Sequence, residues 1–194
     1  MKRPLILVGG GGHCKSVIDV AESAGFDIMG ILDKPDLVGT RVLDYPIIGT
    51  DEDIPLYADK VDFIISVGQI ESNAVRKRIA ARIEETGGNY ATLVASDAQV
   101  SRFAEIGEGT VVMHRAVVNA GARIGRNTII NTMVNIEHDA SVGDFCHIST
   151  GTMVNGGTHI GDNCFVGSGA VLYHCISVSE GTIIPAGTIV RKSV

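Results

Sequence analysis

The last hundred residues carry a branched aliphatic side chain at every sixth position, and this period constrains the fold more than any other feature of the chain. The seventeen consecutive positions are Val94, Val100, Ile106, Val112, Val118, Ile124, Ile130, Ile136, Val142, Ile148, Val154, Ile160, Val166, Leu172, Val178, Ile184 and Val190. A six-residue period cannot keep one face of an α-helix buried, and the many glycine and β-branched residues also disfavour helix. Hexapeptide periods are typical of a parallel β-helix, in which each hexad forms one short strand and one turn.

Two further hexad positions are restricted. The residue four positions after each aliphatic is usually small, as at Ala116, Thr128 and Cys146, so that it fits beside the large residue inside a narrow coil. Glycine recurs at the second position (Gly107, Gly125, Gly143, Gly161, Gly167) and at the fourth (Gly109, Gly121, Gly151, Gly157, Gly169, Gly181, Gly187). We expect both sets of glycines to supply turn conformations.

Composition limits the class of protein. The chain has 194 residues, 45% hydrophobic and 20% charged, as in an ordinary globular protein of one or two domains. No apolar run is long enough to span a membrane, and no export signal opens the sequence, so we expect a cytoplasmic protein without a membrane partner. The net charge of −6 argues against nucleic acid as a partner.

The four cysteines, Cys14, Cys146, Cys164 and Cys175, show no CxxC pair and no zinc-ligand spacing. Cys146 and Cys164 both occupy the small inward position of a hexad. We therefore expect reduced core thiols and no bound metal.

The first part of the chain has an α/β pattern. Residues 5–8 and 28–32 read as strands, 16–24 as a helix, 63–67 as a further strand and 71–85 as a helix. Arg76, Lys77, Arg78 and Arg82 are expected on the solvent side of this last helix. Residues 89–94 are expected to form one strand that leads into the β-helix.

A glycine turn, residues 9–12, joins the first strand to the first helix. Its spacing is not that of the dinucleotide fingerprint, which would need glycine at Cys14. Such a turn still lets the backbone approach a phosphate at the helix N-terminus. Gly12, His13, Asp33 and Gly68 all fall at the carboxyl ends of expected strands, where ligands of open parallel sheets bind.

Of six histidines, His138 has the most suggestive surroundings. It lies at a turn between two hexads, between Glu137 and Asp139. A turn side chain points outward, and an imidazole is a suitable general base near pH 7. A neighbouring carboxylate can hold one ring nitrogen protonated and leave the other free to accept a proton. A solvated turn histidine without a catalytic role is the alternative.

Together, the glycine turn that runs into Gly12-His13, the strand that ends at Asp33, Gly68, and the hexads with Ile136-Glu137-His138-Asp139 resemble the sugar-nucleotide N-acetyltransferases over essentially the whole chain. The resemblance implies a Rossmann-like α/β domain in residues 1–93 that binds the sugar nucleotide. It also implies a left-handed parallel β-helix with three hexads per coil in residues 94–194. The left hand comes from the resemblance alone.

The resemblance also assigns residues to roles. His138 is the general base, and Asp139 raises its basicity, with Glu137 as the second candidate. His147, Gly156, Ser168, Ala186 and Asn131 are implied to contact acetyl-CoA, with the Gly156 N–H stabilising the oxyanion. The residues implied to contact the sugar nucleotide are Gly11, Gly12, His13, Cys14, Asp33, Lys34 and Gly68. Cys14, Lys34 and a C-terminal segment without the family's Gly-Val-Pro-Ala sequence depart from the family pattern.

We therefore predict an acetyl-CoA-dependent N-acetyltransferase that needs no metal and acts on a nucleotide-linked amino sugar, most consistent with a UDP-4-amino-4,6-dideoxy sugar of the bacillosamine type. The resemblance implies a homotrimer with the active site between chains, and the outward apolar residues Val111, Val117, Ile129, Met153, Phe165 and Val171 favour it. The alternatives are O-acetylation of a sialic-acid-type sugar and a GDP- or dTDP-linked substrate. A zinc hydratase and a non-catalytic scaffold are rivals from other classes.

Overall fold

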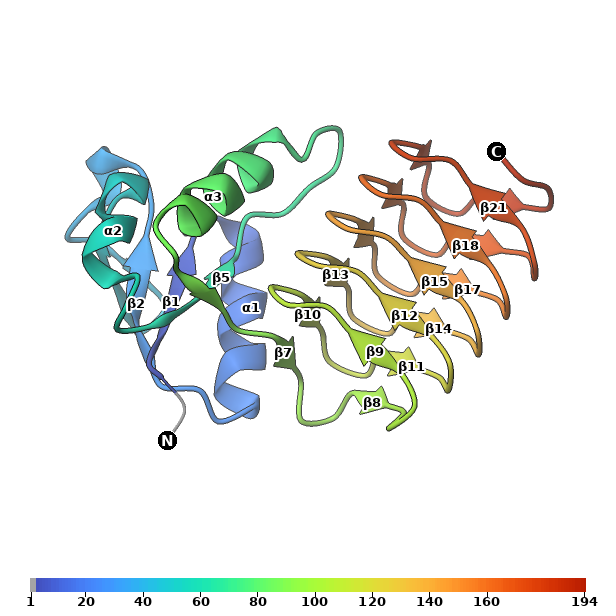
Figure 1. The fold of residues 1–194 in the computed structure, drawn as a ribbon, viewed down its shortest axis with the longest axis horizontal. Coiled ribbons are helices and arrows are strands. Elements are labelled where there is room, and N and C mark those ends of the chain that lie inside the picture. The colour runs from blue at the N-terminus through green and yellow to red at the C-terminus, as the bar shows by residue number, and fades with distance from the viewer. Residues whose placement is uncertain (1–2) are drawn as a thin grey trace. The chain divides into compact units, whose positions relative to one another are not determined.

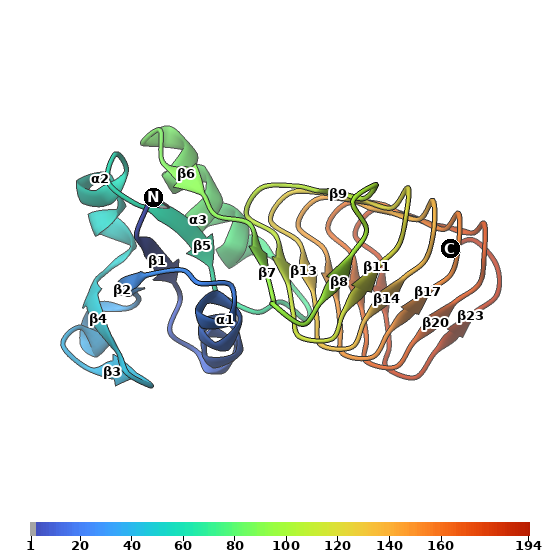
Figure 2. The ribbon, with the colours of Figure 1, turned by 90° about the horizontal axis from the view of Figure 1, so that it is seen from below.

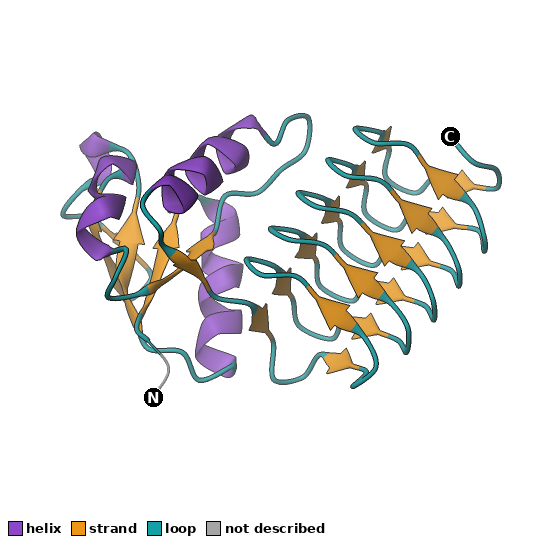
Figure 3. Cartoon of the chain, viewed as in Figure 1, coloured by secondary structure: helices purple, strands orange, loops and turns teal. Residues whose placement is uncertain are grey.

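The computed structural model describes residues 3–194. They form two compact units that divide between Ala91 and Thr92. Within the described chain all helices belong to the first unit, and the second consists of short strands and turns (Figure 3). None of these helices combines the length and the apolar character that a bilayer span requires.

The first unit is a six-stranded sheet in the order β3-β4-β2-β1-β5-β6, parallel except for the β3–β4 pair. The strands are β1 (Leu5–Val8), β2 (Ile28–Leu32), β3 (Arg41–Val42), β4 (Tyr45–Gly49), β5 (Asp62–Ile65) and β6 (Asn89–Tyr90). The helices are α1 (Gly12–Ser23), α2 (Ile54–Tyr57) and α3 (Ala74–Glu85), with 3₁₀ turns at Pro35–Leu37 and Asp51–Asp53. Every residue of β1 is buried, as expected of a central parallel strand covered on both faces.

The strands predicted at residues 5–8 and 28–32 are confirmed, whereas β3, β4 and α2 were not predicted from the sequence. Helix α1 begins at Gly12, directly at the end of the glycine turn and earlier than the expected residue 16. The single strand expected over residues 89–94 is wrong. Residues 89–90 pair with β5 in the first unit, whereas β7 (Leu93–Val94) pairs within the second.

Arg76 corrects the expected orientation of α3. Its side chain is buried and donates hydrogen bonds to the carbonyls of Ile65, at 3.3 Å, and Val67, at 2.6 Å. Burial lowers the pKa of the guanidinium to about 10. Arg76 therefore braces the end of β5, while Arg78 and Arg82 lie at the surface and pair with Asp51 and Glu52.

The second unit is a column of stacked coils made of three parallel sheets (Figures 1 and 2). The first sheet contains β7 (Leu93–Val94), β10 (Val111–Val112), β13 (Ile129–Ile130), β16 (His147–Ile148), β19 (Phe165–Val166) and β22 (Ile183–Ile184). The second contains β8 (Gln99–Val100), β11 (Val117–Val118), β14 (Asn135–Ile136), β17 (Met153–Val154), β20 (Val171–Leu172) and β23 (Ile189–Val190). The third contains β9 (Glu105–Ile106), β12 (Arg123–Ile124), β15 (Ser141–Val142), β18 (His159–Ile160) and β21 (Ser177–Val178).

The strand register confirms the prediction of three hexads per coil. Val112 pairs with Ile130, and Ile130 with Ile148, so each coil uses three hexads. The hexad aliphatics from Val112 onward point inward and are buried in one continuous core with small residues such as Ala116, Cys146 and Cys164. In the first coil Val94, Val100 and Ile106 are only partly buried.

The two sets of glycines have different roles. Fourth-position glycines such as Gly121 and Gly151 have a positive φ, 76° and 68°, which is the left-handed turn conformation. Second-position glycines have no positive φ; instead, a Cβ at Gly107 would lie 2.6 Å from the carbonyl carbon of Gly125 in the next coil. The expected turn role is therefore wrong for the second position, where glycine lets neighbouring coils approach closely.

The cysteines are all free. Cys14, Cys146 and Cys164 are buried, and the thiols of Cys146 and Cys164 each lie 3.1 Å from a carbonyl oxygen inside the column. Cys175 is exposed at a turn and so is not a core thiol.

Candidate functional site

His138 lies at an edge of the column that we call the histidine edge, formed by the turns that lead from the second to the third sheet. It follows β14 and is exposed, and Asp139 has a φ of 59°. That conformation folds the carboxylate back onto its neighbour, so His138 Nδ1 lies 2.8 Å from Asp139 Oδ2. The Asp139 hydrogen bond, with smaller contributions from the charges of Asp139 and Glu137, raises the pKa of His138 above its usual value of 6.5.

Glu137 is held differently. One carboxylate oxygen accepts a hydrogen bond from Asn119 Nδ2 at 3.1 Å, and the other accepts from Asn135 Nδ2 at 2.8 Å. Both oxygens therefore have amide partners, whereas the Asp139 carboxylate bonds the imidazole. Of the two acids that the sequence left open, the geometry favours Asp139 as the partner of His138.

Two glycines make room for this pair. A Cβ at Gly121, one coil before Asp139, would lie 2.5 Å from Asp139 Oδ1. A Cβ at Gly156, one coil after His138, would lie 2.7 Å from His138 Nε2. Nδ1 thus faces Asp139 while Nε2 faces Gly156. The Gly156 carbonyl accepts a hydrogen bond from the Cys175 N–H at 3.0 Å. Within residues 3–194 the Gly156 N–H has no hydrogen-bond acceptor.

Three of the remaining column residues gather at a second edge, which we call the serine edge. It is formed by the turns from the first to the second sheet, with Asn131, Ser168 and Ala186 along it. Ser168 Oγ lies 2.9 Å from Ser149 Oγ. His147 belongs to strand β16 and is only 7% exposed, so it is not a surface turn residue. Its Nε2 lies 2.9 Å from Asn131 Nδ2, and its ring meets the edge of Phe165.

The first unit contains a cavity of about 650 Å³ at the carboxyl ends of β1, β2 and β5. Six of the seven residues predicted to contact the sugar nucleotide line it: Gly11, Gly12, His13, Asp33, Lys34 and Gly68. Cys14 does not, because its side chain is fully buried on the inner face of α1. Burial raises the pKa of the Cys14 thiol to about 11. The Cys14 side chain therefore does not reach the cavity, and the contact of Cys14 with the sugar nucleotide stays a prediction.

The glycine turn has a tight half and an open half. Gly9 has a φ of 108°, and a Cβ there would collide with Val67 Cγ2. A Cβ at Gly10 would lie 2.6 Å from Asp33 Oδ2, which accepts the Gly10 N–H at 2.6 Å. At Gly11 and Gly12, by contrast, a Cβ would meet nothing within 4 Å. The open half lies at the N-terminus of α1, whose first turn has no acidic side chain, and this favours an anionic ligand.

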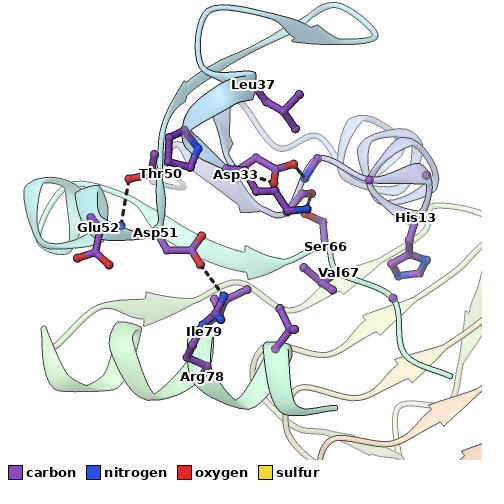
Figure 4. A pocket seen from close by; sticks show the side chains of 18 residues that line it. His13, Asp33, Leu37, Thr50, Asp51, Glu52, Ser66, Val67, Arg78 and Ile79 are labelled. Atoms are coloured by element: carbon purple, nitrogen blue, oxygen red, sulfur yellow. Dashed lines mark hydrogen bonds and ion pairs between the residues drawn. The ribbon is translucent and has the colours of Figure 1, made fainter. Parts of the chain in front are cut away.

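The sequence did not single out the opposite wall of the cavity. Thr50, Asp51 and Glu52 line it, together with Arg78 from α3, and Arg78 Nη2 lies 3.4 Å from Asp51 Oδ2 (Figure 4). Strand β4, which brings Thr50 and Asp51 to the cavity, contains Pro46 and ends in Gly49, so its sequence gives little strand signal. Residues 3–194 contain no group of three or more His, Cys, Asp or Glu side chains that could hold a metal ion.

Comparisons with known proteins agree with this architecture. The PglD N-terminal domain family matches residues 4–83. A mutant of perosamine N-acetyltransferase from Caulobacter crescentus, solved with CoA and GDP-perosamine, is 29% identical over 98% of this chain and 90% of that chain, with a TM-score of 0.89. The acetyltransferase domain of PglB from Neisseria gonorrhoeae FA1090 is 32% identical over 100% of this chain and 94% of that chain, with a TM-score of 0.91. The chain belongs to the sugar-nucleotide N-acetyltransferases.

As a member of this family it is an acyltransferase, and its column is a left-handed β-helix, as predicted. The PglB domain has also been solved with acetyl coenzyme A. WeeI from Acinetobacter baumannii AYE, 24% identical over 98% of this chain and 92% of that chain with a TM-score of 0.86, shares the fold. No curated protein matches the chain by sequence.

Proposed function

We propose that this protein transfers the acetyl group of acetyl-CoA to the amino group of a nucleotide-linked amino sugar, with His138 as general base. The observation that carries the proposal is the exposed His138–Asp139 pair, whose free nitrogen, Nε2, faces Gly156. The solved relatives bound to acetyl coenzyme A, or to CoA with GDP-perosamine, support the two substrate classes. A cytoplasmic location remains a prediction.

The proposed chemistry assigns a step to each group. Asp139 keeps the proton on Nδ1 of His138, so that Nε2 can accept one. Nε2 takes the proton that the amine nitrogen loses as it attacks the thioester carbonyl carbon, and returns it to the departing CoA sulfur. The Gly156 N–H, which has no acceptor within residues 3–194, is the candidate donor to the developing oxyanion. Acetyl passes directly from sulfur to nitrogen.

The first unit is proposed to bind the nucleotide part of the substrate. Its diphosphate would approach the open N–H groups of Gly11 and Gly12, and Lys34 and Arg78 are the cations in the cavity wall. Three carboxylates, on Asp33, Asp51 and Glu52, lie in the same wall. Asp33 is already engaged by the N–H groups of Gly10 and Lys34, so it shapes the turn.

A trimer is part of the proposal because the outer faces of the column differ in polarity. The third sheet presents polar residues: Glu105, Arg123, Ser141, His159 and Ser177. The second sheet presents Val117, Met153, Val171 and Ile189, and Met153 and Ile189 are 38% and 53% exposed. Val111 and Ile129, which also suggested assembly, are already buried and do not add to this uncovered surface. A face of this kind suits contact between copies around a threefold axis.

A substrate panel tests the function. We expect thiol release from acetyl-CoA only when an amino sugar nucleotide is present, with the 4-amino-4,6-dideoxy UDP sugar turned over faster than its GDP- and dTDP-linked counterparts. Mass spectrometry should show one acetyl group on the sugar nitrogen. Acetylation of a hydroxyl of a sialic-acid-type sugar would instead support the O-acetyltransferase, and no acceptor-dependent thiol release would reject the proposal.

The two halves of the glycine turn allow a matched test of the nucleotide site. Gly12→Ala adds a methyl group that meets no protein atom but projects from the open half of the turn. We expect an unchanged melting temperature and about tenfold weaker binding of the preferred nucleoside diphosphate, measured by calorimetry. Gly9→Ala should lower the melting temperature instead, because Gly9 has a φ of 108° and no room for a Cβ. Equal binding by wild type and Gly12→Ala would place the diphosphate elsewhere.

A further inference from the structure

Positive charge is distributed unevenly along the β-helix. From residue 127 to residue 190 the sequence contains neither lysine nor arginine, although it contains Glu137, Asp139, Asp144, Asp162 and Glu180. The next cations are Arg191 and Lys192, both exposed. The coils after His138 are therefore acidic until this pair is reached.

Arg191 and Lys192 follow β23 on the histidine edge, the edge of the column that carries His138. Strand β23, which directly precedes Arg191, lies three coils after β14, the strand that precedes His138. Three coil spacings of about 4.8 Å amount to about 14 Å. Val194 N–H bonds to the Ser177 carbonyl and Ser179 N–H to the Val194 carbonyl, so the segment after β23 reaches the third sheet two residues earlier than in the preceding coil, where Gly161 N–H bonds to the Val178 carbonyl.

Arg191 is held in place by an aromatic ring. Its guanidinium carbon lies 5.4 Å from the centroid of the Tyr173 ring, one coil before it, and Tyr173 itself packs against the core. A guanidinium over an aromatic ring keeps its N–H groups available at the ring's margins. Within residues 3–194 no carboxylate pairs with Arg191 or Lys192, whereas Arg123 and Arg126, before His138, lie near Glu105 and Glu108 at 3.6 and 3.9 Å.

The direction of the bound thioester follows from His138. Its Nδ1 faces Asp139, and its Nε2 faces Gly156 in the following coil. The reacting carbonyl must lie near Nε2, so it lies on the C-terminal side of the imidazole. An extended pantetheine arm from that position can span the three coils to Arg191 and Lys192, the first cations after Arg126 in the column.

We infer that Arg191, held over Tyr173, and Lys192 bind the phosphate groups of the coenzyme A nucleotide. This inference rests on the proposed function, because it takes acetyl-CoA as the acyl donor. It goes further because it assigns two residues to the phosphate groups of the nucleotide, which acetyl-CoA has and an acyl-pantetheine lacks. Phosphate oxygens accept the charge-assisted hydrogen bonds that a planar guanidinium donates in pairs.

Calorimetry with coenzyme A and with pantetheine tests the inference without catalysis. Wild type is expected to bind coenzyme A more tightly, and Arg191→Gln to weaken coenzyme A about tenfold while leaving pantetheine unchanged. Arg191→Gln/Lys192→Gln should weaken it further, and Arg191→Lys less than Arg191→Gln. Arg123→Gln, an exposed arginine near Glu105, is the matched control and should bind both ligands as wild type does.

Kinetics separate this inference from the proposed function. Arg191→Gln should raise the KM for acetyl-CoA about tenfold and leave the KM for the sugar nucleotide and for acetyl-pantetheine unchanged. Coenzyme A binding that Arg191→Gln does not weaken, equal loss of pantetheine binding, or a raised KM for the sugar nucleotide would each overturn the inference. A wild type that binds coenzyme A through Arg191 but acetylates no amino sugar would overturn only the proposed function.

Discussion

Replacing His138 by alanine is expected to lower kcat by about 10² to 10⁴, the usual contribution of a positioned general base. The side chain is exposed, and within residues 3–194 its only side-chain hydrogen bond is to Asp139, so the melting temperature should stay the same. Thiol release from acetyl-CoA with the preferred amino sugar nucleotide measures the loss. Coenzyme A binding by calorimetry is the control, because the variant should retain it. Full activity in His138→Ala would favour the non-catalytic scaffold or a different base.

The two neighbouring acids should respond differently. Asp139→Asn keeps an oxygen that can accept from Nδ1 but loses the charge that raises the pKa of His138. We expect about a tenfold loss of kcat/KM. Glu137→Gln should cost at most about threefold, because Asn119 and Asn135 hold that carboxylate and an amide oxygen can still accept from one of them. Equal losses in both variants would contradict the assignment of Asp139.

The pH dependence of kcat/KM tests the role of Asp139 independently. A general base must be unprotonated, so kcat/KM falls as the pH drops below the pKa of His138. Since the Asp139 hydrogen bond raises that pKa above 6.5, the acid limb of the wild-type profile should lie above pH 6.5. Asp139→Asn removes the negative charge and should move the limb to lower pH. An acid limb that does not move in Asp139→Asn would show that another group titrates.

The sequence predicts the β-helix well because its period is a geometric requirement on every coil. Ile130 can be buried only if the chain returns after three hexads to place Ile148 above it, so one slip would expose the core. The outward position of His138 follows from the same register. Its contact with Gly156 joins residues one coil apart, so it becomes visible only once three hexads are placed in each coil.

The first unit was predicted less completely because its details depend on long-range contacts. Arg76 looks like a surface residue of a basic helix, yet the carbonyls of Ile65, at the end of β5, and of Val67, just beyond it, accept hydrogen bonds from its guanidinium and allow its burial. Residues 89–94 have a continuous strand composition, but the chain changes sheet after Tyr90. Neither the burial of Arg76 nor the change of sheet after Tyr90 can be recognised from the neighbouring residues in the sequence. The same is true of Arg78, which reaches the cavity wall from α3.

The second large effect is expected from Gly156→Ala, which separates the geometry of the active site from the stability of the column. Gly156 has no positive φ, so alanine introduces no backbone strain there. The three atoms nearest to its Cβ would all belong to the far end of the His138 ring, with Nε2 at 2.7 Å. The ring can move away at little cost in folding free energy, but a displacement of about 1 Å can lower the rate about 10²-fold. We therefore expect kcat to fall about 10²-fold with an unchanged melting temperature.

Gly161→Ala is the matched control, because it also replaces a glycine without a positive φ in the same column. Its Cβ would lie 2.7 Å from the backbone nitrogen of Glu180, and a ladder of stacked coils cannot move aside as a side chain can. Overpacking of this kind costs about 1–3 kcal/mol, which lowers the melting temperature by several degrees. Its kcat should remain near that of wild type at temperatures where the variant is folded. If Gly156→Ala instead lost stability and kept its kcat, the imidazole would not be the group that the glycine accommodates, and the proposed position of the reacting carbonyl beside Nε2 would be wrong.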